Sequence, residues 1–189
     1  MSQGRFTLVR APRSVVGYYG CQLAVAESLL GGEAMLPSQN AYDWLGSGVY
    51  FWEYAPFRAL EWAEAKCAQI GGQPAVLTAT LRLGSCLNLL DTEYAVALGV
   101  TYEVIASQIN QDQPLRNTRS GAHFLDNAVI ETHCRLTVEQ GFHQYDSVRG
   151  CFPEGSPVYP GSKIVDKAHV QIAVRNPTCI SNVRLVVLD

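Results

Sequence analysis

The sequence predicts an α+β domain in which a mixed β-sheet core is flanked by helices. Three observations favour this class: strand-like segments lie toward both ends of the chain, helical patterns occupy its middle, and a long loop containing proline and glycine separates two C-terminal strands. The 189 residues, 48% hydrophobic and 16% charged, suffice for one well-buried core and are few for two. We therefore expect a single domain over residues 1–189.

The N-terminal elements follow from short apolar patterns and their glycine boundaries. Residues 5–9 predict a strand, and residues 17–20 (Gly-Tyr-Tyr-Gly) predict a turn after it. Residues 22–30 carry leucine and alanine at helical spacing and end at two glycines, which predicts a helix. Residues 40–48 predict a loop that leads into a short apolar strand over residues 49–52.

A second helix and the clearest strand of the chain come next. Pro56 predicts the start of a helix that ends at Gly71, because proline is tolerated in a first helical turn and glycine stops a helix. Residues 75–83 predict a strand, since their leucines alternate with threonine and arginine. The expected apolar stripe of the helix consists of Phe57, Leu60, Ala63, Cys67 and Ile70.

The middle of the chain is helical in pattern. Residues 92–108 predict one helix, with Asp91 as its N-cap, and residues 124–139 predict another. Residues 110–121 between them predict a polar loop.

Extended segments return in the last third. Residues 146–152 predict an extended segment, and residues 153–167 a loop longer than the roughly 12 residues beyond which loops are commonly functional. Residues 169–175 and 182–188 predict two strands joined by a turn at Asn176.

Charge and hydropathy exclude several classes of function. The net charge is −3 and no basic run exceeds two residues, so strong nonspecific binding to nucleic acid is not expected. Dispersed arginines (Arg116, Arg119 and Arg149) can still form a local basic groove, which leaves a nucleic-acid substrate open. No apolar run approaches the roughly 18 residues of a membrane span, and the N-terminus lacks the regions of a signal peptide. We expect a cytoplasmic protein without membrane contact.

The six cysteines are scattered and form no C-x-x-C pair, so we expect reduced, mostly buried thiols. The ligand spacing of a zinc site is absent as well, and no metal is expected.

Three segments carry the functional signal. They are residues 17–21 (Gly-Tyr-Tyr-Gly-Cys), residues 43–52 (Asp-Trp-Leu-Gly-Ser-Gly-Val-Tyr-Phe-Trp), and residues 167–174 beyond the long loop (Lys-Ala-His-Val-Gln-Ile-Ala-Val). In this order the chain resembles the ADP-ribosyltransferase superfamily, in its diphtheria-toxin and PARP-like branch. It is most similar to small bacterial members of toxin or phage-defence type with a Tyr-Asp-Trp-Leu-Gly-x-Gly-(Ile/Val)-Tyr-Phe-Trp-Glu core. The resemblance extends from residue 18 to residue 179; the second motif is specific, and the other two are weak alone.

The resemblance implies a split mixed β-sheet and an NAD site. Tyr19 stands where the family has its NAD-binding histidine, and its hydroxyl can donate and accept hydrogen bonds. Gly20 would let its backbone approach the nicotinamide amide, because it carries no Cβ. Tyr50, with Gly48 beside it, would stack on the nicotinamide ring.

The resemblance also implies a catalytic set. Gln171 stands where the family has its catalytic glutamate; it can hold a ribose hydroxyl but has no negative charge and cannot act as a base. Proton removal would then pass to Glu154 or to the substrate, and Tyr50 completes the set.

Two further residues are expected at the acceptor end. His169 projects to the same side of its strand as Gln171, so it would line the cleft. Arg149, beside the long loop, would pair with a phosphate or with Asp146.

Other polar and aromatic residues near these motifs have structural interpretations. Trp44, Trp52 and Trp62 are interpreted as packing residues, and Asp43 and Glu53 as caps or salt-bridge partners as readily as site groups.

The function implied is an NAD-dependent mono-ADP-ribosyltransferase that moves ADP-ribose to a macromolecular acceptor, protein or nucleic acid. The setting implied is a bacterial toxin or defence effector with a neutralising antitoxin protein as partner. Two alternatives stay open: an NAD glycohydrolase, in which water is the acceptor, and a catalytically silent module that binds NAD or ADP-ribose. The departures at Tyr19 and Gln171 favour the silent module. An RNA 2′-phosphotransferase would share the fold but needs basic phosphate ligands that the sequence does not place.

Overall fold

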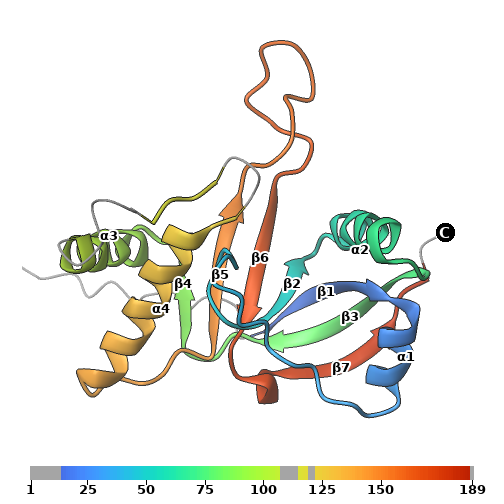
Figure 1. Cartoon of the computed structure of the whole chain (residues 1–189), viewed down its shortest axis with the longest axis horizontal. Coiled ribbons are helices and arrows are strands. Elements are labelled where there is room, and N and C mark those ends of the chain that lie inside the picture. The colour runs from blue at the N-terminus through green and yellow to red at the C-terminus, as the bar shows by residue number, and fades with distance from the viewer. Residues whose placement is uncertain (1–13, 107–114, 119–121, 188–189) are drawn as a thin grey trace, which may run out of the picture.

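The computed structural model describes residues 14–106, 115–118 and 122–187, and Figure 1 shows their arrangement. The predicted α+β class is confirmed, because a mixed sheet is flanked by helices. In chain order the elements are β1 (Ser14–Gln22), α1 (Leu23–Leu30), β2 (Val49–Glu53), α2 (Pro56–Ile70), β3 (Pro74–Arg82), β4 (Cys86–Asn88), α3 (Thr92–Ala106), α4 (Phe124–Glu139), β5 (Ser147–Phe152), β6 (His169–Val174), a 3-10 turn (Pro177–Cys179) and β7 (Ile180–Leu185).

The sheet opens between β1 and β2. Within the described residues its strand order is β4-β5-β6-β2-β1-β3-β7, with β4 and β5 parallel and the other pairs antiparallel. β1 pairs with β2 only through Gly17 with Glu53 and Tyr18 with Trp52, whereas β1 and β3 pair along the whole of β1. Beyond Tyr18 the two strands diverge. In Figure 1, β4, β5 and β6 accordingly run upright, while β1, β3 and β7 run obliquely.

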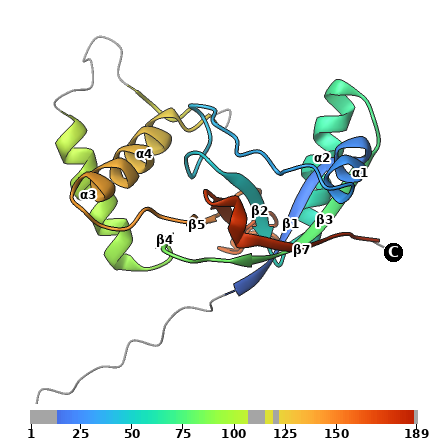
Figure 2. The ribbon, with the colours of Figure 1, turned by 90° about the horizontal axis from the view of Figure 1, so that it is seen from below.

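Alternation along β2 assigns the helices to the two faces of the sheet. Tyr50 and Trp52 point to the face on which α4 packs through Ile130 and α2 packs through Ala59. Phe51 points to the opposite face, which α1 covers beside β3. In Figure 2, α3 and α4 lie at one end of the sheet, and α1 and α2 at the other. The opening between β1 and β2 therefore lies between the helix pair α3 and α4 at one end of the sheet and the pair α1 and α2 at the other.

The two glycines of the first motif let neighbouring elements pack closely against the strand in which they lie. The predicted turn at residues 17–20 is wrong, because these residues lie inside β1. A Cβ on Gly17 would come within 2.5 Å of Leu81 Cδ1, and one on Gly20 within 2.1 Å of the Ala59 carbonyl oxygen of α2. Glycine is thus required here by contact with neighbouring elements rather than by a turn conformation.

Most other elements match their predictions closely. The helix over residues 124–139 is confirmed at both ends, and α2 begins at Pro56 and stops before Gly71, whose φ is +84°. The Asp91 cap is confirmed: its Oδ1 accepts from the Glu93 N–H at 3.2 Å. The cysteines are free, and four of the six are buried.

Three further features of the fold differ from the prediction. β4 was not predicted, and the last strand begins at Ile180 after the 3-10 turn. The apolar stripe of α2 is wrong at its ends, because Phe57 and Ile70 are 63% and 59% exposed and the buried residues of the helix are Ala59, Ala63 and Cys67. The predicted strand at residues 5–9 and most of the loop at residues 110–121 lie outside the described residues.

No helix among the described residues combines the length and apolar character that crossing a membrane requires.

Candidate functional site

A cleft of about 660 Å³ lies where β1 and β2 diverge. Its lining comes from both strands, one flank of α2, the loop over residues 36–44, β6, and the start of the long loop after β5. Six residues that the sequence singled out line it together: Tyr19, Gly20, Gly48, Tyr50, Glu154 and Gln171.

Tyr50 is held by its hydroxyl. The hydroxyl donates to the Gly46 carbonyl oxygen at 2.6 Å and accepts from the Leu45 N–H at 2.9 Å. Burial raises the pKa of Tyr50 well above its ordinary value, so the phenol stays protonated and keeps both bonds. The phenol is therefore a fixed wall of the cleft, and its ring is the part left to contact a ligand.

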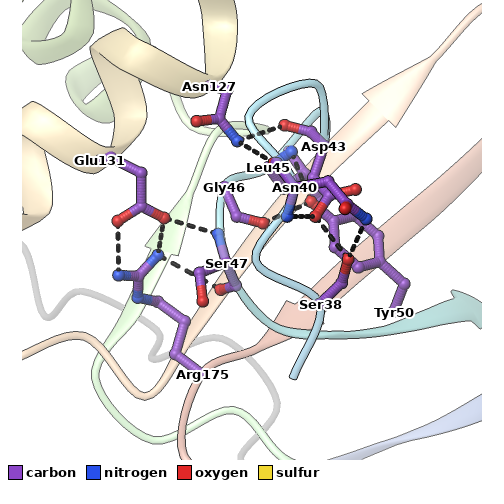
Figure 3. Close-up of polar contacts among 10 residues, drawn as sticks. All are labelled: Ser38, Asn40, Asp43, Leu45, Gly46, Ser47, Tyr50, Asn127, Glu131 and Arg175. Carbon is purple, nitrogen blue, oxygen red and sulfur yellow. Dashed lines mark hydrogen bonds and ion pairs between the residues drawn. The ribbon is translucent and has the colours of Figure 1, made fainter. Parts of the chain in front are cut away.

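Two layers of hydrogen bonds hold the loop that precedes Tyr50 (Figure 3). Asp43 accepts from the Ser38 hydroxyl at 2.6 Å and from the Asn40 N–H at 3.0 Å, as a cap within the loop. From α4, the Asn127 side chain donates to the carbonyl oxygens of Asn40 and Asp43 at 3.2 and 3.0 Å. The loop is thus fixed from within and from the helix above it.

One turn further along α4, Glu131 joins the same loop to the end of β6 (Figure 3). Its carboxylate pairs with Arg175 through two bonds of 2.7 and 3.0 Å, and one of its oxygens also accepts from the Ser47 N–H. Burial alone would raise the pKa of Glu131, but the bonds from Arg175 and Ser47 lower it below its usual range. A Cβ on Gly46 would meet the Glu131 carboxylate, so a side chain there would have to displace that carboxylate.

Tyr19 reaches the cleft from the other face of the sheet. Its ring lies 5.8 Å from that of Phe51 and packs in the core on that face. Burial, the largest cause, raises the pKa of Tyr19. Together with Leu36 it also lines a smaller cavity of about 390 Å³ beside α1, so Tyr19 stands between two cavities.

The two glycines of the predicted NAD site are constrained by the protein itself. Gly20 lies against the Ala59 carbonyl of α2. Gly48 exchanges two backbone hydrogen bonds with Ser38, at 2.8 and 3.0 Å, and a Cβ on it would come within 3.0 Å of Ala173. Both line the cleft, but packing already explains why each is glycine.

Gln171 lies on β6 opposite Trp52 and lines the cleft, whereas His169 is buried and is not part of the lining. The Nδ1–H of His169 donates to the Lys167 carbonyl oxygen at 2.7 Å, and its ring lies 5.7 Å from that of Phe152. Burial, the largest cause, lowers the pKa of His169. His169 therefore shares a strand face with Gln171 as expected, but it packs against Trp52 and Phe152 and does not line the cleft.

Glu154 lines the cleft as an ion-pair partner. Its carboxylate accepts from Arg58 of α2 at 2.7 Å and lies 3.8 Å from His169 Nδ1. Arg58 also pairs with Glu61, which in turn lies 3.3 Å from the Lys167 ammonium at the other end of the long loop. These pairs attach both ends of that loop to α2.

Arg149 lies elsewhere. It is next to Gly150, the β5 residue that pairs with Gln171, so its side chain projects to the opposite face of the sheet. There it donates to the Glu53 carboxylate at 2.6 and 2.8 Å and to Asn88 at 3.2 Å. The expected pairing with Asp146 is wrong, and the structure does not bring Arg149 to the cleft.

Sequence reasoning missed the wall contributed by α2. Arg58, Trp62 and Lys66 line the cleft at four-residue spacing. Of the three, only Trp62 is singled out from the sequence, as a packing residue; the four-residue spacing that joins it to Arg58 and Lys66 is the signal that could have found this wall. Trp44 and Trp52 also line the cleft while packing against Phe152 and Trp62, with ring centroids 4.0 and 5.9 Å apart. Among the described residues, no three His, Cys, Asp or Glu side chains gather as metal ligands.

No family model matches the chain. Over 183 residues it is 24% identical to an uncharacterized protein of Methanocaldococcus jannaschii, in an alignment that covers 86% of this chain and 83% of that protein. Among solved structures, the crystal structure of an anti-CRISPR protein aligns over 92% of this chain and 96% of its own, with 12% identity and a TM-score of 0.35. So low a TM-score carries neither fold nor function from that protein to this one.

Proposed function

We propose that the cleft between β1 and β2 binds NAD and that the protein is a mono-ADP-ribosyltransferase acting on a macromolecular acceptor. One observation carries the proposal: residues from three distant motifs, Tyr19, Tyr50 and Gln171 among them, line a single cleft. Its volume of about 660 Å³ lies within the range of roughly 300–1,000 Å³ typical of ligand sites.

The chemistry assigns each residue a simple task. Tyr50 presents its ring to the nicotinamide, and Gln171 hydrogen-bonds a hydroxyl of the attached ribose. The bond from ribose C1′ to the nicotinamide nitrogen breaks, the electron pair leaves with nicotinamide, and positive charge develops on the ribose. A nucleophile of the acceptor then forms the new bond to C1′, and its proton passes to Glu154 or to solvent. Positioning supplies most of the catalysis, because nicotinamide is already a cationic leaving group.

A specific observation favours a second candidate, a silent module that binds NAD or ADP-ribose. Gln171 provides no negative charge, and the Glu154 carboxylate is already paired with Arg58 at 2.7 Å. Without a free carboxylate at the ribose, the protein can bind NAD but stabilises the oxocarbenium-like state of the reaction less. Measurable binding with little turnover is the signature of this alternative.

The test follows both products of the reaction. Purified protein is incubated with NAD alone and with NAD plus a bacterial lysate, and released nicotinamide and ADP-ribose bound to macromolecules are measured by mass spectrometry. Tyr50→Ala and Gln171→Ala are expected to lose both products. Gln144→Ala, at an exposed position outside the cleft, is the matched control and is expected to behave as the parent protein.

Each outcome points to one function. Release with transfer to a macromolecule supports the transferase and identifies the acceptor class. Release without transfer assigns the glycohydrolase. Binding of NAD without release assigns the silent module, and failure to bind NAD overturns the proposal.

A further inference from the structure

One flank of α2 gives the cleft a basic and aromatic wall. Arg58, Trp62 and Lys66 are four residues apart, so they follow one another along the same side of the helix, and all three line the cleft. The adjacent side carries Ala59 and Ala63, which are buried against the sheet. The docking of α2 on the sheet therefore aims this flank at the cleft.

Two of the charged residues in the cleft form an ion pair with each other, and the other two do not. Four of the described lining residues are charged: Asp43, Arg58, Lys66 and Glu154. Arg58 is paired with Glu154, whereas Asp43 keeps its negative charge and accepts two hydrogen bonds from neutral groups of its own loop. Among the described residues no carboxylate forms an ion pair with Lys66; its ammonium lies 4.8 Å from the centroid of the Trp62 ring. Of the two described cations in the lining, Lys66 is therefore the one that no carboxylate pairs, and it lies on α2.

We propose that Lys66, held over the indole of Trp62, binds phosphate groups of the ligand. Under the proposed function, on which the identity of the ligand rests, these are the diphosphate of NAD. A lysine ammonium binds phosphate as a compact point charge. Its contact with Trp62 restrains the side chain before the ligand arrives, which lowers the entropy lost on binding.

The rest of the lining fits a ligand with phosphates between two ring systems. Tyr19 and Tyr50 line the cleft from the strands, and Trp44 from the loop over residues 36–44. Aromatic walls suit planar rings, and the unpaired Lys66 ammonium on α2 suits the diphosphate that joins those rings.

The test separates phosphate binding from ring binding. Dissociation constants of three probes, ADP-ribose, inorganic pyrophosphate and nicotinamide riboside, are measured by calorimetry at low and high salt. The variants are Lys66→Met, Lys66→Arg, and Lys163→Met as a control that removes the same charge from an exposed loop position. Lys66 is itself exposed, so its variants are expected to fold.

Lys66→Met is expected to weaken ADP-ribose and pyrophosphate about five- to tenfold, with a smaller salt dependence, and to change nicotinamide riboside less than about twofold. Lys66→Arg should retain most of the affinity, and Lys163→Met all of it. Equal weakening of the three probes, or no weakening of any, overturns the phosphate site. If the parent protein binds neither NAD nor ADP-ribose, the proposed function fails. Pyrophosphate then decides separately: binding that depends on Lys66 keeps the phosphate site for another ligand, and its absence removes it.

Discussion

The Tyr50 hydroxyl and the Gly46 carbonyl oxygen are joined by a hydrogen bond of 2.6 Å, so the strand residue closes the loop from which its own strand emerges. The same hydroxyl accepts from the N–H of Leu45 at 2.9 Å. Leu45 and Gly46 are both buried, so water cannot readily replace the hydroxyl if it is removed. Tyr50 is therefore a structural latch of the cleft loop as well as a wall of the cleft.

Tyr50→Phe is expected to lower the free energy of unfolding by about 1–3 kcal/mol, because it leaves a buried donor and acceptor unpaired while keeping the ring. Urea denaturation measures this. Tyr159→Phe, at a residue 60% exposed in the long loop, is the matched control and should change stability by less than about 0.5 kcal/mol. Equal stabilities of the two variants would show that the latch contributes nothing.

Glu131→Gln is expected to weaken the pH dependence of stability in the acid range. The folded pKa of Glu131 lies below the reference value of 4.5, because the bonds from Arg175 and Ser47 outweigh the effect of burial. A lowered pKa contributes stability that is present above the unfolded pKa and is lost as pH falls through the folded pKa. As the pH is lowered from about 5 to 3, the melting temperature of the parent protein should therefore fall more steeply than that of the variant.

The contribution of Glu131 has its own control. Glu139→Gln removes a carboxylate from the same helix that pairs with Arg135 on the surface, where both side chains are more than half exposed. Surface pairs contribute little, so this variant should retain the parent pH profile. An unchanged profile for Glu131→Gln as well would contradict a coupling between α4 and the cleft loop.

Local signals in the sequence were enough for most of the fold. The α4 bounds and the α2 start at Pro56 follow from periodicity and end signals that act within one or two turns. Gly17 and Gly20 led to the wrong prediction of a turn, because glycine is typical of turns. Here glycine leaves space for Leu81 and the Ala59 carbonyl, which belong to elements far along the chain. A contact of that kind has no local signature.

The candidate site, too, could be predicted from the sequence only in part. The resemblance selected Tyr19, Tyr50 and Gln171, which the fold brings to one cleft. It also selected Arg149, whose place depends on the register of β5 with β6, and a shift of one residue moves a side chain to the other face. The cleft-facing role of Lys66 depends on how α2 docks on the sheet, so its position in the helical pattern could not reveal it.

Cys151 is expected to be the fastest-reacting thiol of the folded protein. It is the exposed cysteine, whereas Cys21 and Cys134 are buried and burial raises the pKa of each to about 11. The thiolate is the reactive form, so raised pKa and low access both protect the buried thiols. Iodoacetamide labelling at pH 8, followed by peptide mass spectrometry, should modify Cys151 first and all six cysteines only in denaturant. In Cys151→Ser the fast phase should disappear, and a fast phase at Cys21 would contradict the packing of β1.

Gly20→Ala tests whether the position of α2 sets the shape of the cleft. A Cβ at this residue would lie 2.1 Å from the Ala59 carbonyl oxygen, so α2 or β1 must shift to admit it. Overpacking of this kind is expected to lower the free energy of unfolding by about 1–3 kcal/mol. Because the same helix carries Lys66 into the cleft, affinity for ADP-ribose should fall as well. Gly99→Ala is the control: it adds the same methyl group in α3, where nothing lies within 4 Å, and should stabilise the helix by roughly 0.5–1 kcal/mol. Parent-like stability and affinity in Gly20→Ala would mean that the strand and helix can separate freely, and that the cleft does not depend on their contact.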